Sequence, residues 1–195
     1  MLKAGLLALA LALPAGAAWA APMFDDFQGL CVKTAADPAA TVAAATAGGW
    51  SPVPAPLLAQ FSGAAGVQDA DGRMRSDANG LSFVLVGHKQ LPVGGATLSV
   101  RFCAVATTAA PPAGQLPDAL SAWAAVPAAA SMSKPGQTGY FFLDDAGGHK
   151  PVPMDDPAAA MAMAKSGHLR LAFVQESKSI HMLAFAIPFD VSPAT

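Results

Sequence analysis

One alternating stretch constrains the fold of this chain more than any other. Residues 96–107 read Ala-Thr-Leu-Ser-Val-Arg-Phe-Cys-Ala-Val-Ala-Thr, and successive side chains of a strand point to opposite faces. One face would carry Leu98, Val100, Phe102, Ala104 and Ala106, and the other Thr97, Ser99, Arg101, Cys103 and Val105. The stretch therefore predicts a strand with one fully apolar side. Because Cys103 is one of only two cysteines, we expect this strand also to hold one end of the chain's single crosslink.

The N-terminus has the pattern of an export signal. Lys3 supplies a positive charge, residues 6–13 form an apolar run, and Ala18-Trp19-Ala20 has the small-x-small form of a signal-peptidase site. The run is too short to span a bilayer as a permanent helix, which needs about 20 apolar residues. We therefore predict that residues 1–20 are a cleaved signal peptide and that residues 21–195 form a single globular α+β domain.

The two cysteines, Cys31 and Cys103, both lie in the predicted mature chain. In an exported protein such a pair favours a disulfide over a metal or redox pair. Two buried free thiols remain the alternative. The signal sequence and the cysteine pair together predict an exported protein, periplasmic or extracellular.

The charge balance excludes some partners. The chain has 11 Lys and Arg against 13 Asp and Glu, a formal net charge of −2, and only 12% of its residues are charged. This is unlike the basic footprint of a nucleic-acid-binding protein, and the sequence has no basic amphipathic helix of the kind that lies on membranes. We expect no nucleic-acid partner and no integral membrane segment after signal cleavage.

Two hairpins and several short helices define the predicted fold. Strands at 81–88 and 96–107 form one hairpin, and strands at 168–176 and 179–189 form another. A further strand is predicted at 139–144, and residues 73–75 fit a short edge strand between two turns. In the second hairpin we predict that residue 175 pairs with 180, which puts Arg170 opposite Phe185. Short helices are expected near 23–33, 38–47, 117–126 and 157–166, the last three rich in Ala and the second capped by Asp37 with Pro38 in its first turn. The predicted class is α+β: an antiparallel sheet of about five to six strands built from hairpins, with short Ala-rich helices on one face.

Arg101 is the most informative polar residue, because it lies within an otherwise apolar strand. A buried charge must find a carboxylate or reach water. The sequence therefore allows two interpretations of Arg101: an ion pair under the helix layer, or a pocket for an anion or carboxylate.

Sulfur and imidazole side chains suggest a second candidate site. Thioether and imidazole ligands suit Cu(I), and the C-terminal part of the chain supplies Met154, Met161, His168, His181 and Met182. Met182 is expected to pack in the core, as methionine often does. We therefore predict no metal and no cofactor, and keep a Met/His copper-binding protein as an alternative.

No catalytic motif is present: the sequence has no Gly-Xaa-Ser-Xaa-Gly elbow, P-loop, His-Glu-Xaa-Xaa-His or dinucleotide-binding glycine pattern. We therefore predict a small exported, non-catalytic binding or envelope-associated module, whose partner is an envelope protein or a small ligand. The alternative is a hydrolase with a dispersed site, which requires a pocket where His, Asp and either Ser or Tyr140 converge.

Overall fold

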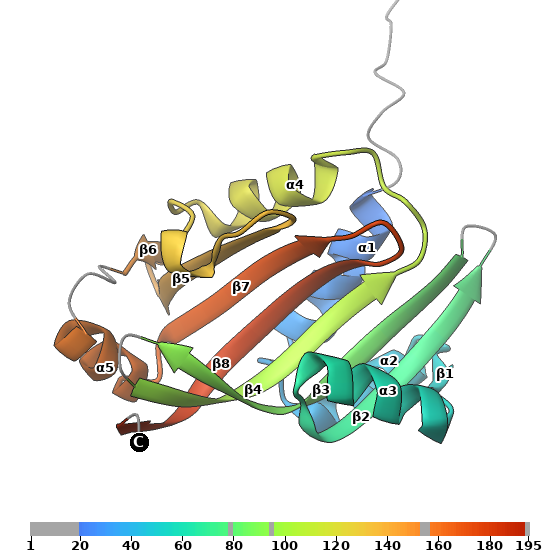
Figure 1. Cartoon of the computed structure of the whole chain (residues 1–195), viewed down its shortest axis with the longest axis horizontal. Helices are drawn as coiled ribbons and strands as arrows, with labels where there is room; N and C mark the ends of the chain where they lie inside the picture. The colour runs from blue at the N-terminus through green and yellow to red at the C-terminus, as the bar shows by residue number, and fades with distance from the viewer. Residues whose placement is uncertain (1–19, 78–79, 94–95, 153–156, 194–195) are drawn as a thin grey trace, which may run out of the picture.

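The protein is built around one antiparallel sheet. A computed structural model (Figure 1) describes residues 20–77, 80–93, 96–152 and 157–193. The predicted signal peptide, except Ala20, lies outside the described residues. Eight strands of the described chain follow the order β1-β2-β3-β4-β8-β7-β5-β6 across the sheet. Their bounds are β1 Ser51–Pro52, β2 Gln68–Asp77, β3 Gly80–Val93, β4 Ala96–Thr107, β5 Gln137–Asp145, β6 Gly148–Pro151, β7 Leu169–Glu176 and β8 His181–Pro193.

The predicted class, α+β with an antiparallel sheet, is confirmed, but the predicted strand count of five to six is wrong. The sequence predicts neither β1 nor β6, and within β2 it indicates only a short edge strand over residues 73–75, because these segments lack an alternating apolar pattern. Strand β2 reads Gln-Asp-Ala-Asp-Gly-Arg-Met-Arg-Ser-Asp, and it is extended because it pairs along most of its length with β3. Strand β1 covers two residues of a proline-rich segment that meets β2. These segments are strands because their backbones pair with a longer neighbouring strand. The pattern of their side chains does not indicate this pairing.

The register predicted for the last hairpin is also wrong. Gln175 pairs with Met182 rather than with residue 180, so the observed register is shifted by two positions. A shift by two keeps every side chain on its predicted face, because the period of a strand is two. It does change the neighbours: Leu171 pairs with Ala186, which puts Arg170 beside Ile187 instead of Phe185.

Helices cover both faces of the sheet, which corrects the expectation that they lie on one. On one side, here called the α1 face, lie α1 Ala20–Asp26, the π-helix η1 Phe27–Val32, α2 Pro38–Ala47 and α4 Gln115–Ala124. On the other side, the α3 face, lie α3 Ala55–Ala65, the short 3-10 helix η2 Ala130–Met132 and α5 Pro157–Lys165. Figure 1 shows α3 and α5 in front of the sheet and α1 and α2 behind it.

The strand sequences explain the two layers. Cys103 and Val105 of β4 are buried in the core of the α1 face, together with Phe27. Phe102 and Ala104, the alternate residues of the same strand, are buried in the core of the α3 face. A central strand that is apolar on both sides needs cover on both sides, so the alternation predicted for residues 96–107 is confirmed with both faces buried.

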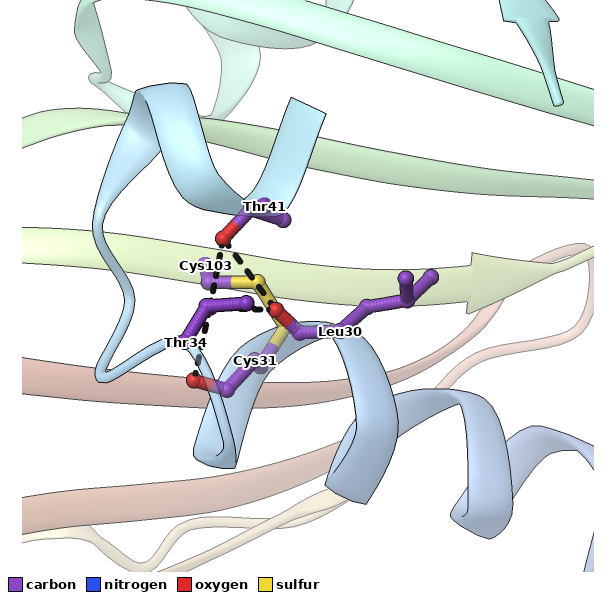
Figure 2. The surroundings of a disulfide bond; sticks show 5 residues. All are labelled: Leu30, Cys31, Thr34, Thr41 and Cys103. Carbon is purple, nitrogen blue, oxygen red and sulfur yellow. Dashed lines mark hydrogen bonds between the residues drawn. A yellow bond between two sulfur atoms is a disulfide. The ribbon is translucent and has the colours of Figure 1, made fainter. Parts of the chain in front are cut away.

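Cys31 and Cys103 form a disulfide that fastens η1 to β4 (Figure 2), with a Cα–Cα distance of 5.4 Å. Both cysteines are fully buried. Beside them the hydroxyl of Thr41 donates to the carbonyl oxygen of Leu30 over 3.1 Å and lies 2.7 Å from the hydroxyl of Thr34. These contacts hold the start of α2 against the end of η1. A disulfide-bonded pair is consistent with an oxidising, exported compartment.

The connection between η1 and α2 follows the predicted capping. Asp37 precedes the helix, and its carboxylate accepts a hydrogen bond from the backbone N–H of Ala40 over 2.9 Å, while Pro38 occupies the first turn. Just before the cap, Ala35 and Ala36 have φ angles of 54° and 51°. Two successive left-handed residues reverse the chain tightly enough for α2 to return over the disulfide.

Candidate functional site

An apolar groove lies on the α3 face, between α3 and the hairpin of β7 and β8. Its floor is one row of paired residues across four strands: Phe83, Ala106, Met182 and Gln175. Ala104 extends the floor to the next row. Alanine side chains at the centre of the floor, flanked by the larger Phe83 and Met182, leave a hollow that larger residues would fill.

Helix α3 forms one wall of the groove. Gly72 of β2 lets the helix approach the sheet, because a Cβ atom at this position would lie 3.1 Å from the Cδ1 atom of Leu58. Further along the helix, the ring of Phe61 meets the ring of Phe83 edge-on, with centroids 4.9 Å apart. No residue of α3 is fully buried, so the helix rests on the sheet through a few contacts rather than within a closed core.

Lys89 of β3 holds the C-terminal end of α3. Its ammonium group donates to the carbonyl oxygen of Ala65, the last residue of the helix, where the helix dipole favours a positive charge. The same group lies 5.5 Å from the centre of the Phe102 ring. Burial lowers the pKa of Lys89, and the nearby charge of Lys134 lowers it further.

The lining of the groove is almost entirely apolar and carries no ionisable side chain. The groove has a volume of about 260 Å³. It is lined by Phe61, Ala64, Ala65, Phe83, Leu85, Ala104, Ala106, Gln175, Ser177, Ile180 and Met182. Gln175 and Ser177 are the only polar residues of the lining, and both lie at its hairpin end. Ligand sites combine apolar walls with a few polar groups in this way, although the volume is just below their usual range of about 300–1,000 Å³.

Apart from Met182, which the sequence offers as a copper ligand, the groove residues are not among the site residues predicted from the sequence. The sequence of residues 57–61 fits either a helical turn or an edge strand. The groove also depends on α3 lying next to a hairpin that is more than 100 residues away in the sequence. One signal was available in the sequence. Ala104 and Ala106 interrupt the large side chains of the apolar face of β4, and small residues in such a row indicate space above the sheet.

The structure places Arg101 on the α1 face, on the same side of β4 as Cys103 and two residues from it. The Nε atom of Arg101 is buried and has no hydrogen-bond partner among the described residues. The ion pairs found in this part of the chain do not include Arg101. The ion pair under the helix layer, one of the two interpretations from the sequence, is therefore not formed with any described carboxylate.

The candidate copper ligands are not brought together. Met154 lies outside the described residues. His168 precedes β7 and His181 begins β8, so they lie at opposite ends of one hairpin, and eight strand residues separate such ends by about 25 Å. Met161 belongs to α5, while Met182 lines the groove. The described residues contain no group of three or more His, Cys, Asp or Glu side chains able to hold a metal ion.

Each of the four histidines has a local contact, and His149 and His168 lie on either side of Asp144. The Nδ1–H of His149 donates to the carbonyl oxygens of Trp123 and Ala124, each over 3.2 Å, at the C-terminus of α4. His168 donates to the carbonyl oxygen of Asp144 over 3.1 Å. The Nδ1 atom of His181 is buried, lies 3.9 Å from a carboxylate oxygen of Glu176 and has no hydrogen-bond partner among the described residues. His88 lies 3.5 Å from Asp69.

The pocket required by the hydrolase alternative is not found at these positions. Tyr140 is buried in the core of the α1 face, with 3% of its surface exposed, and the lining of the groove contains no His or Asp side chain. His149 and His168 use Nδ1 to bond backbone carbonyl groups.

Comparisons with models of protein families, with curated protein sequences and with solved structures found no match to this chain. Within the described part of the chain, every helix is too short or too polar to cross a bilayer.

Proposed function

We propose that this protein is an exported, non-catalytic binding module whose groove beside α3 holds a short, uncharged aliphatic group. The observation that carries the proposal is the apolar lining: nine of its eleven residues are apolar, and none carries a charge. A charged ligand would lose its hydration without gaining a partner there. An aliphatic ligand would gain contacts with Leu85, Ile180 and Met182 while leaving a polar end at Gln175 and Ser177.

The volume of the groove limits the size of the ligand. At about 30 Å³ for a water-sized group, 260 Å³ accommodates about nine non-hydrogen atoms. Each buried methylene contributes about 0.8 kcal/mol, and the loss of free motion on association costs about 4 kcal/mol or more. The net gain for such a small ligand is about 3 kcal/mol, which corresponds to a Kd on the order of 10 mM. Nuclear magnetic resonance (NMR) titration is suited to this range.

The test uses 1-octanol, whose chain and single hydroxyl match the groove in size and polarity. Methyl signals of Leu85, Ile180 and Met182 are followed during the titration. We expect saturable shifts confined to these groove methyls. Octanoate, which adds a negative charge, is expected to bind at least tenfold more weakly.

A matched pair of variants locates the site. Ala106→Trp fills the floor of the groove and is expected to abolish the shifts, whereas Ala122→Trp, on the exposed side of α4, is expected to leave them unchanged. Equal shifts in both variants, or no saturable shift in the parent chain, would contradict the proposal. Concentration-dependent shifts of the same methyls without octanol would identify a second copy of the chain as the occupant, and would also contradict it.

A further inference from the structure

A cationic row lies on the α1 face, on the opposite side of the sheet from the groove. Arg101 of β4 pairs with Ile187 of β8 on one side and with His88 of β3 on the other. Arg170 of β7 lies beside Ile187, because Leu171 pairs with Ala186. We propose that Arg101 and Arg170 together bind a small oxyanion group, a carboxylate or a phosphate.

The strand order places both arginines on one face. Cys103 and Val105 share the side of β4 on which Arg101 lies, and both belong to the core of the α1 face. On β7, Ala172 and Val174 lie on the same side as Arg170, and they too belong to the core of the α1 face. One strand, β8, separates β4 from β7, so the two arginines are about 10 Å apart at their backbones. Two long side chains that start at this separation on the same face are able to converge on one anion between them.

The charges of the row are only partly compensated. The Nε atom of Arg170 lies 3.6 Å from a carboxylate oxygen of Asp144, and its Nη1 atom donates to the carbonyl oxygens of Gly167 and Leu169 over 2.8 and 3.0 Å. Arg101 has no such partner among the described residues, and its Nε atom is buried. The positive charge of Arg101 is therefore not offset by any described carboxylate.

The electrostatic coupling of the two arginines supports their proximity. Burial lowers the pKa of Arg170, Asp144 raises it, and the positive charge of Arg101 lowers it further. On the other side of Arg101, His88 is 41% exposed and is next to Asp69, whose side chain is 83% exposed. Among the described residues, the carboxylates paired with members of the row lie at its two ends, Asp144 beside Arg170 and Asp69 beside His88.

The chemistry of guanidinium selects an oxyanion. A guanidinium group presents N–H donors in a planar fork that matches the oxygen spacing of carboxylate and phosphate groups. A buried donor without an acceptor costs free energy, so an anion that accepts from the Nε–H of Arg101 removes that cost. A halide ion offers no pair of oxygens to this fork and is expected to bind much more weakly.

The experiment is an NMR titration of the Nε–Hε signals of the arginines with inorganic phosphate, and in a second arm with acetate, at constant ionic strength maintained with chloride. We expect saturable shifts of the Arg101 and Arg170 signals. The arm with the lower Kd decides whether the site prefers phosphate or carboxylate. Absence of a saturable shift with either anion would overturn the proposal.

Two variants keep the test interpretable. Arg101→Met is expected to weaken binding at least tenfold, as followed by the remaining Arg170 signal, while Lys178→Met, which removes an equal charge from an exposed turn, is expected to leave the Kd unchanged. If Arg101→Met does not fold, Arg101→Lys is used instead. This variant keeps the positive charge but lacks the planar set of N–H donors, and it is expected to bind the anion several-fold more weakly. Unchanged phosphate and acetate binding in the Arg101 variant would overturn the proposal. Failure of this anion-binding proposal would leave the groove proposal unaffected, because the two sites lie on opposite faces of the sheet.

Discussion

Removal of the disulfide should destabilise the protein by an amount set mainly by the unfolded chain. Cys31 and Cys103 are 72 residues apart in the sequence, and the loop-closure relation gives about 4.4 kcal/mol at 25 °C for a loop of this length. Residues 21–195, the predicted mature chain, lose about 0.37 kcal/mol/K of entropy on folding, so the melting temperature of that chain should fall by about 12 °C. The folded structure should persist, because Phe27 and Thr41 still hold η1 and α2 in place by packing and hydrogen bonding.

The assay is urea unfolding of the double variant Cys31→Ser/Cys103→Ser, followed by tryptophan fluorescence, beside the oxidised parent. Reduced parent protein is the matched control, since it keeps both sulfur atoms in the core and lacks only the bond. The two crosslink-free forms should agree with each other to about 1 kcal/mol. A reduced parent as stable as the oxidised one would refute the reasoning, because the loss in the double variant would then arise from core packing rather than from the crosslink.

Two further predictions concern the backbone and a buried charge. Ala125, the exposed residue that ends α4, has a φ angle of 52°, so Ala125→Gly should stabilise the protein by about 1 kcal/mol. Ala122→Gly, within the same helix, should destabilise it by about as much; a loss of stability in both variants would contradict this account. Burial lowers the pKa of Lys89 below its ordinary value of 10.5, so the unfolded chain binds this proton more tightly than the folded one. Stability relative to Lys89→Met should therefore rise with pH in the window between the lowered pKa and about 10.5, as measured by urea unfolding at a series of alkaline pH values; a relative stability that is flat or falls with pH would contradict the shift.

Several elements could be predicted because their signal is local. The helix that begins after Asp37 follows from a cap and a proline at fixed spacing, and the observed bond from Ala40 confirms it. The strand at residues 96–107 follows from alternation, and the observed bounds of β4 are the same. Such patterns involve only residues that are close in the sequence, so they do not depend on the tertiary structure.

Other elements required partners that are distant in the sequence. Strand β2 is polar and is extended only because β3 offers it hydrogen bonds. The last hairpin lacks a two-residue Gly or Asn turn signal in its sequence. Its turn is closed instead by Ser177, whose hydroxyl accepts a hydrogen bond from the N–H of Ile180 over 3.0 Å, and its strands pair with β5 and β4. Helix α3 buries no residue completely, and its sequence does not indicate which face of the sheet it covers.

The sequence by itself determined the fold class, the central strand and the two cysteines available for a crosslink, because alternation, capping and cysteine number are properties of the chain alone. It also marked Arg101 as a charge in need of a partner. Only the tertiary structure decided that this partner is not a described carboxylate and that Arg170 shares the face. It also placed α3 over Ala104 and Ala106 to form a groove. These outcomes depend on strand order and register, which arise from backbone pairing between distant segments and leave no trace in the local pattern of side chains.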